Sequence, residues 1–134
     1  MTRLIDIEGV GPTYANKLQN AGVRSAESLL ARGGTPAGRK EIAAKSGVSD
    51  ALILQWVNHV DLFRIKGVGS EYADLLEAAG VDTVVELAQR NPDQLHPTLL
   101  ATNHAKKLVR RPPGFDQVRS WIQQAKKLPR KVSY

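Results

Sequence analysis

Two glycine turns are the features of this sequence best suited to hold a ligand. Gly9-Val10-Gly11 and Gly67-Val68-Gly69 each precede a segment whose apolar residues have helical spacing. Glycine permits a positive φ and leaves no side chain in the path of a ligand. The helix that follows presents free backbone N–H groups and the positive end of its dipole. We therefore expect each turn, anchored by its inward-pointing valine, to form a small cradle for one phosphate oxygen of a nucleic-acid backbone.

The side chains around the two turns carry both signs of charge. The hydroxyl and cationic groups are candidate binding residues: Thr13, Lys17, Arg64, Lys66 and Ser70. Carboxylates also lie near the turns: Asp6, Glu8, Glu71, Asp74 and Glu77. Each carboxylate would repel a phosphate by up to about 1 kcal/mol at an exposed site. We favour the second turn because two cations flank it and a full helix precedes it.

Positive charge is concentrated at the C-terminal end of the chain. The 134 residues carry a net charge of +6. Residues 106–134 hold nine basic side chains and one acidic side chain. This segment predicts an anion-seeking surface if the fold gathers its cations, or a solvated tail if it does not. The basic residues are Lys106, Lys107, Arg110, Arg111, Arg119, Lys126, Lys127, Arg130 and Lys131, of which the first four are candidate nucleic-acid contacts.

Catalytic and metal-binding patterns are missing from the sequence. The chain has no cysteine, and His59, His96 and His104 lack the spacing of metal ligands. Neither a Ser-His-Asp arrangement nor a phosphate-binding P-loop motif is present. Asp6 and Glu8, two residues apart, are weak evidence for Mg²⁺. We expect a protein without catalytic activity, bound metal or cofactor.

The composition also bears on the cellular compartment of the protein and on the ligands it could bind. No apolar run reaches the roughly 18–20 residues of a membrane span, and the acidic start is unlike a secretory signal. The lack of cysteine fits a reducing compartment, so we expect a cytoplasmic protein without a membrane partner. Aromatic residues make up 5% of the chain, which argues against stacking single-stranded bases.

An internal repeat organises the chain. Residues 7–23 and 65–81 are identical at ten of seventeen positions, with an offset of 58. Trp56 matches Trp121 at an offset of 65, so the second copy carries seven extra residues, which we place near residues 102–114. A repeat of some sixty residues buries too little surface to be secure alone, so we expect the two copies to pack together.

The elements that position the turns are expected to be helices throughout. Gly22 and Gly80 are typical helix stops, while Thr35-Pro36 and Asn91-Pro92 are typical helix starts. Thr83 with Glu86 forms the pattern of a capping box. The matching tryptophans are expected to be core residues of the two halves. We predict helices near residues 12–21, 25–32, 36–46, 49–62, 70–79, 83–90, 92–102 and 115–127.

The turns also carry a family resemblance. Ile-x-Gly-Val-Gly, then alanine, leucine and an Ala-Gly-Val stop, resembles the helix-hairpin-helix motif, in which Gly-x-Gly amides meet DNA phosphates without reading sequence. The whole chain is similar to a bacterial family known as domain of unknown function 4332. That resemblance includes Arg39-Lys40-Glu41-Ile42-Ala43, Ser46-Gly47-Val48-Ser49 and Leu108-Val109-Arg110-Arg111. It implies an all-α fold of two tandem helix-hairpin-helix repeats, residues 1–63 and 64–134, packed with pseudo-two-fold symmetry.

Two functions remain open at this point. The first is nonspecific or structure-selective binding of nucleic acid, DNA or RNA, through backbone phosphates. Its contacts would be Gly9, Gly11, Thr13, Lys17, Arg64, Lys66, Gly67, Gly69, Ser70, Lys106, Lys107, Arg110 and Arg111. The alternative is a protein–protein adaptor whose basic end docks an acidic partner. The sequence leaves the oligomeric state and the identity of any protein partner undetermined.

Overall fold

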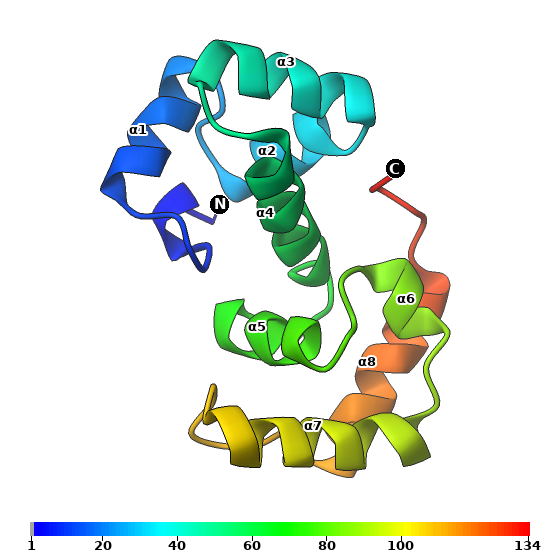
Figure 1. Cartoon of the computed structure of the whole chain (residues 1–134). Helices are drawn as coiled ribbons and strands as arrows, with labels where there is room; N and C mark the ends of the chain where they lie inside the picture. The colour runs from blue at the N-terminus through cyan, green and yellow to red at the C-terminus, as the bar shows by residue number, and fades with distance from the viewer. Residues whose placement is uncertain (1) are drawn as a thin grey trace. The chain divides into compact units, whose positions relative to one another are not determined.

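The described part of the chain is entirely helical, as predicted. A computed structural model describes residues 2–134, and Met1 lies outside it. Residues 2–134 form eight α-helices and one short 3₁₀ helix, and this range contains no strand (Figure 1). In chain order the elements are η1 Leu4–Asp6, α1 Pro12–Asn20, α2 Ala26–Gly33, α3 Pro36–Ser46, α4 Asp50–Leu62, α5 Ser70–Ala78, α6 Val84–Ala88, α7 Pro92–Lys106 and α8 Phe115–Lys127.

The predicted helix boundaries are confirmed to within two residues, except at the end of α7. We expected this helix to end near residue 102, but it continues to Lys106. Lys107 then ends it in the left-handed conformation, with φ 53° and ψ 48°, and its amide donates to the Asn103 carbonyl at 2.7 Å. The sequence has no glycine at this helix end, so the stop signal that follows α1, α3 and α5 is missing.

Local signals in the sequence explain why most helices begin and end where they do. Gly22 and Gly80 follow α1 and α5 with φ of 86° and 94°. In both places the amide of the next residue bonds back to the last helical turn at 2.9 Å, which satisfies an otherwise unpaired carbonyl. Thr35 and Asn91 cap α3 and α7 with their side chains. The Thr83 hydroxyl likewise caps α6.

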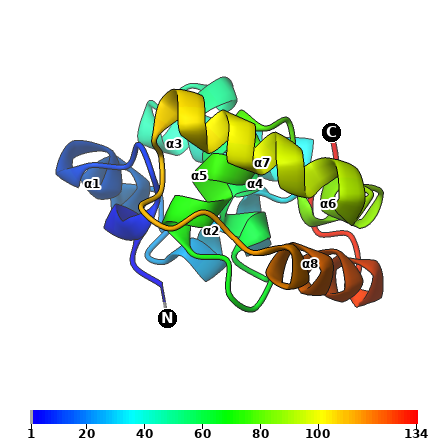
Figure 2. The same cartoon turned by 90° about the horizontal axis from the view of Figure 1, so that it is seen from below.

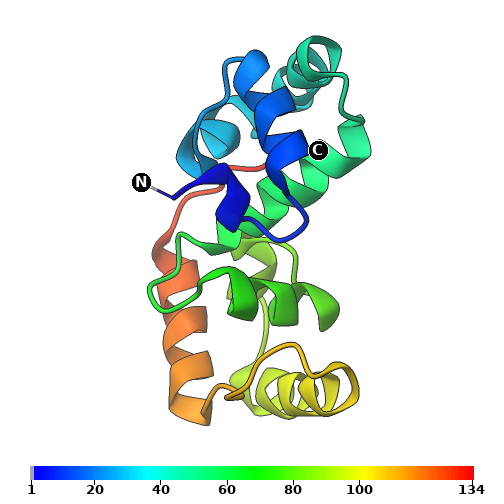
Figure 3. The ribbon, with the colours of Figure 1, turned by 90° about the vertical axis from the view of Figure 1, so that its left-hand side faces the viewer.

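The chain divides into two compact units. The first runs up to Asp61 and includes Lys131–Tyr134, and the second is Leu62–Arg130. The sequence-based boundary was placed after residue 63, with the C-terminal residues assigned to the second half. In the structure the last four residues pack with the first unit, and their red trace is visible in Figure 3.

The C-terminal residues are held in the first unit by a buried arginine. Arg39, which is 7% exposed, donates from its guanidinium to the carbonyls of Gly33 and Ser133 at 2.9 and 2.7 Å. The Ser133 amide donates to the Gly34 carbonyl at 2.8 Å. A Cβ on Gly34 would clash with the carbonyl oxygen of Lys131. Glycine at this position therefore lets the C-terminal backbone approach closely.

The second unit packs its four helices around one apolar core. α8 lies against α6 and α7, and α5 packs against α7 (Figure 2). The core includes Leu76, Leu87, Leu99 and Trp121. Residues 107–114 connect α7 to α8, within the range in which we placed the extra residues.

Both units bury a tryptophan beneath their glycine turn. Trp56 and Trp121 are 1% and 2% exposed, which confirms their prediction as core residues. The Tyr14 ring lies 5.0 Å from that of Trp56, at an interplanar angle of 62°. The Tyr72 ring lies 5.2 Å from that of Trp121, at 57°. Each turn therefore rests on an aromatic pair in the interior of its own unit.

Candidate functional site

The first glycine of each turn has a structural role. Gly9 and Gly67 have φ of 89° and 93°, a conformation that residues with a Cβ rarely adopt. A Cβ at these positions would lie 3.4 Å from Nε1 of Trp56 and 3.3 Å from Nε1 of Trp121. The turn geometry and the indole beneath it therefore account for these two glycines. The valine that follows each one is buried, as expected, at 3% for Val10 and 5% for Val68.

The second glycine of each turn has no such role. Gly11 has φ −89° and ψ −175°, and Gly69 has φ −97° and ψ −165°, which are extended conformations open to any residue. No heavy atom lies within 4 Å of a Cβ built on either glycine. Each glycine is the N-cap of the following helix and forms no side-chain cap. Glycine here leaves open space directly in front of a helix N-terminus.

The two turns differ in their backbone donors and their supports. Pro12 at the start of α1 removes one N–H group from the first turn, where the second turn has Ser70. In the second unit, Gln124 of α8 brackets Lys66. The Gln124 Oε1 accepts from the Lys66 amide at 2.9 Å, and its Nε2 donates to the Lys66 carbonyl at 3.3 Å. This clamp fixes the backbone of the second turn while the Lys66 side chain stays exposed.

The end of α7 and the connection from α7 to α8 carry a cluster of cationic side chains. We call residues 106–111 the basic loop, and its four cations, Lys106, Lys107, Arg110 and Arg111, are all exposed. Asn103, which is 8% exposed, holds the loop by two hydrogen bonds. Its Oδ1 accepts from the Val109 amide at 2.9 Å, and its Nδ2 donates to the Val109 carbonyl at 3.1 Å.

One hydrogen bond joins the basic loop to the helix of the second turn. The Tyr72 hydroxyl, in the first turn of α5, donates to the Arg111 carbonyl at 2.9 Å. The loop therefore lies beside the start of α5, three residues beyond Gly69. The second turn and the basic loop are therefore both connected to the start of α5.

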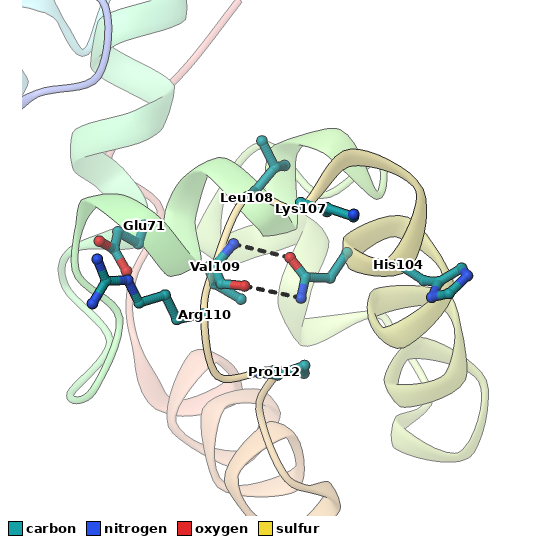
Figure 4. Close-up of a pocket in the computed structure, with 8 residues that line it drawn as sticks. Glu71, His104, Lys107, Leu108, Val109, Arg110 and Pro112 are labelled. Atoms are coloured by element: carbon teal, nitrogen blue, oxygen red, sulfur yellow. Dashed lines mark hydrogen bonds between the residues drawn. The ribbon is translucent and has the colours of Figure 1, made fainter.

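A pocket of about 610 Å³ lies between the basic loop, the end of α7 and the start of α5 (Figure 4). Arg110 and Glu71 line the pocket on one side, and His104 lines it on the other side. Lys107, Leu108, Val109 and Pro112 also line it. The dashed lines in Figure 4 mark the two hydrogen bonds between Asn103 and Val109.

The sequence matches the model of one protein family. Residues 8–128 match the family described as Domain of unknown function (DUF4332). The chain belongs to the DUF4332 family. The match includes both turns and the basic loop. Neither the curated proteins nor the solved structures contain a match to the chain.

The predicted binding residues are divided between the two units of the DUF4332 protein. The second unit contains the basic loop together with Lys66, Gly67, Gly69 and Ser70. The first unit contains Gly9, Gly11, Thr13 and Lys17. The Lys17 ammonium lies 5.8 Å from the centre of the Tyr14 ring, and Thr13 is exposed. Arg64 donates from its guanidinium to the Pro129 carbonyl, so its side chain supports the second unit.

Sequence reasoning missed the residues that hold this surface in place. Tyr72 repeats Tyr14 at the matching position of the internal repeat, and that repetition is the signal that could have identified it. Gln124 and Asn103 bond to backbone groups, which no side-chain pattern reveals. Gln124 is also 58 residues from its partner, Lys66.

Neither metal binding nor a membrane span has support within residues 2–134. That range contains no group of three histidine, cysteine, aspartate or glutamate side chains arranged to hold a metal ion. The Asp6 carboxylate instead lies 3.1 Å from the Arg3 guanidinium. Among the described helices, none combines the length and apolar character that crossing a bilayer requires.

Proposed function

We propose that this DUF4332 protein binds nucleic acid without catalysis, through backbone phosphates and without reading sequence. The observation that carries the proposal is the open space at Gly69. Its extended conformation tolerates any residue and nothing in the protein fills the position of its Cβ, so internal packing gives no reason for glycine. A phosphate in front of the α5 N-terminus would use this space.

The basic loop strengthens the case for the second turn. The hydrogen bond from Tyr72 to the Arg111 carbonyl holds the loop beside the start of α5. A strand whose phosphate met the Gly69 turn would find Arg110 and Arg111 along the same surface. Charge and backbone donors together favour an extended polyanion over a single ion.

We further propose that the two units are tandem helix-hairpin-helix repeats related by a pseudo-two-fold axis. The sequence repeat supports this, and so do the paired turn geometries. Gly9 and Gly67 agree in φ within 4°, and the tyrosine–tryptophan centroid distances are 5.0 and 5.2 Å. In this arrangement Gly11 offers a second, weaker cradle, because Pro12 removes one donor and no basic loop belongs to the first unit.

Salt-titrated binding to labelled duplex, junction and single-stranded DNA tests the proposal. A surface that meets about four to six phosphates gives a log–log salt slope of about 0.9 per phosphate, with little dependence on sequence. Changing Lys106, Lys107, Arg110 and Arg111 to glutamate is expected to abolish binding and leave the fold intact, since exposed charges contribute little to stability.

A matched control makes the same change in net charge elsewhere. It converts Arg24, Lys40, Lys45 and Lys127, all exposed, to glutamate and is expected to keep most of the binding. If all three DNA forms fail to bind the native chain at about 50 mM salt, the proposal is refuted. Docking of the basic loop on an acidic protein would then take its place.

A further inference from the structure

The last four residues of the chain pack with a different unit from the helix that precedes them. Residues 131–134, which we call the tail, belong to the first unit, whereas α8 and the residues up to Arg130 belong to the second. The chain therefore crosses between the units after Arg130, and the tail is held by a groove of the first unit (red trace in Figure 3). The binding of nucleic acid proposed above does not use this segment.

The groove holds the tail mainly through its backbone. The buried Arg39 guanidinium donates to the Ser133 carbonyl at 2.7 Å, and the Ser133 amide donates to the Gly34 carbonyl at 2.8 Å. A Cβ on Gly34 would clash with the Lys131 carbonyl oxygen, so glycine leaves room for the tail. Arg39 also donates to the Gly33 carbonyl at 2.9 Å, which orients its guanidinium toward the tail.

One tail side chain supplies the apolar part of the contact. Val132 is 2% exposed, whereas Tyr134 is 64% exposed and its hydroxyl lies 3.4 Å from Oδ1 of Asn58. The Ser133 hydroxyl donates to the Gly34 carbonyl at 3.3 Å. The groove thus combines backbone hydrogen bonds with a buried site for a single side chain. Proteins bind short peptide segments by this combination, in which the backbone gives affinity and the side-chain site gives specificity.

The link between α8 and the tail is short. α8 ends at Lys127, and residues 128–130 connect it to the tail. Three residues span at most about 10 Å. The Arg64 guanidinium also donates to the Pro129 carbonyl, which holds part of this link in the second unit. A chain can therefore fill its own groove only if that groove lies within this reach, and the groove of a second copy is free of this restriction.

We propose that two copies of this chain exchange their tails, so that each first unit holds the tail of the other copy. The hydrogen bonds and the apolar contact of the closed monomer all recur in such a dimer, so the exchange loses no tail contact. The partner is a second copy because its tail has the very residues that the groove holds. The exchanged dimer is closed by a two-fold axis, since both grooves are then filled.

The balance between closed monomer and exchanged dimer depends on protein concentration. A groove tethered by a short link competes as if it were present at a concentration on the order of 1 mM. We therefore expect sedimentation of the native chain to show a dimer fraction that rises to roughly half at ~1 mM. No nucleic acid is present, so the result does not depend on the proposed function. A native chain that stays monomeric at this concentration would overturn the proposal.

Changing the length of the link tests how the dimer forms. Deleting Arg130 shortens the link, and the effective concentration of a tethered site falls toward zero when its link cannot span the distance. Dimers of this variant should predominate at a concentration at least about tenfold lower. Inserting four glycine and serine residues after Arg130 should instead favour the monomer. A dimer that responds to neither change forms through another surface, and exchange would be refuted.

Substitutions in the tail identify the contact that holds the dimer. In the chain lacking Arg130, Ser133→Pro removes the amide donor to the Gly34 carbonyl. It is expected to weaken dimerisation at least about tenfold, since each dimer contains this contact twice. Val132→Asp, which places a charge in the buried site, should do the same. Ser133→Ala is the matched control, because it keeps the amide and removes only the hydroxyl, and it should retain most of the dimer.

Circular dichroism verifies that each variant remains helical. Should the shortened chain fail to fold, the concentration series of the native chain decides the question. Equal dimerisation by the Ser133→Pro and Ser133→Ala chains would show that the tail does not hold the dimer and would refute the exchange.

Discussion

The Tyr72 hydroxyl donates to the Arg111 carbonyl at 2.9 Å, while the Tyr72 ring packs against Trp121 at a centroid distance of 5.2 Å. One side chain thus joins the basic loop, the start of α5 and the core of the second unit. The backbone of the basic loop is therefore coupled to the start of α5, directly after the Gly69 turn.

Tyr72→Phe tests this coupling, because it removes the hydroxyl and keeps the ring. We expect the free energy of unfolding to fall by about 0.5–1.5 kcal/mol, the usual net value of one hydrogen bond. DNA affinity should fall several-fold as the loop loosens. Urea unfolding and anisotropy titrations measure the two effects. Tyr14→Phe, which removes the matching hydroxyl in the first unit, is the control, and an equal loss of DNA affinity in that variant would argue against the coupling.

Alanine substitutions distinguish the two glycines of the second turn. Gly67→Ala is expected to destabilise the protein by about 1–2 kcal/mol or more, because φ is 93° and Nε1 of Trp121 lies 3.3 Å from the added Cβ. Gly69→Ala is expected to change stability by less than about 1 kcal/mol, since the extended conformation suits alanine while glycine is the better N-cap residue. Thermal unfolding of both variants provides the measurement. A large loss for Gly69→Ala would mean that packing, not a ligand, explains that glycine.

The two tryptophans are predicted to make large and similar contributions to the free energy of unfolding. Trp56→Ala and Trp121→Ala should each cost about 3–5 kcal/mol, as large-to-small changes in a core do. Both side chains are at most 2% exposed. Chemical denaturation followed by circular dichroism measures the cost. A loss below about 1 kcal/mol, typical of surface sites, would contradict their place in the core.

Glu27 gives the stability of the first unit a dependence on pH. Burial raises the pKa of this carboxyl, but hydrogen bonds from the Thr2 amide at 2.8 and 3.1 Å outweigh that effect and hold the pKa below its ordinary value. Because the folded pKa lies below the unfolded one, the stabilisation is present above the unfolded pKa and is lost as the pH falls through the folded pKa.

Glu27→Gln is therefore expected to lower the free energy of unfolding at pH 7. The difference from the native chain should disappear as the pH falls below about 4, where a carboxyl ordinarily becomes protonated. Unfolding curves recorded between about pH 2 and pH 7 test this expectation. If Glu27→Gln lowers the free energy of unfolding by the same amount at every pH in this range, the charge of Glu27 is not the cause of the loss.

The sequence predicts the helices well because their signals are local. Gly22 ends α1, Thr35 caps α3 and Gly47 separates α3 from α4, each within a few residues of the feature it controls. The end of α7 was missed because Lys107 takes a left-handed conformation for which its residue type gives no signal. Helix existence and type thus followed from sequence, whereas this boundary depended on the loop beyond it.

The candidate surface was predicted only in part. The turns and the four cations of the basic loop are visible in the sequence because they repeat or cluster. Their grouping within one unit depends on Gln124 holding Lys66 and on Tyr72 holding the Arg111 carbonyl, contacts that span 58 and 39 residues. Tertiary packing sets such contacts, and no local pattern encodes them.

Binding of labelled duplex DNA at about 50 mM salt by three glutamate variants tests the central claim most directly. The variants are Gly69→Glu, Gly11→Glu and Gly114→Glu. All three glycines are N-caps with negative φ, and a Cβ on any of them meets no atom within 4 Å. Each variant should therefore fold like the native chain, which thermal unfolding verifies.

The account predicts that Gly69→Glu weakens DNA binding at least about tenfold, a change of about 1.4 kcal/mol. Gly11→Glu should have a smaller effect, and Gly114→Glu, which adds the same charge outside the turns, should stay within about twofold of the native affinity. Equal binding by Gly69→Glu and the native chain, or an equal loss in Gly69→Glu and Gly114→Glu, would contradict the claim that the second turn holds a phosphate.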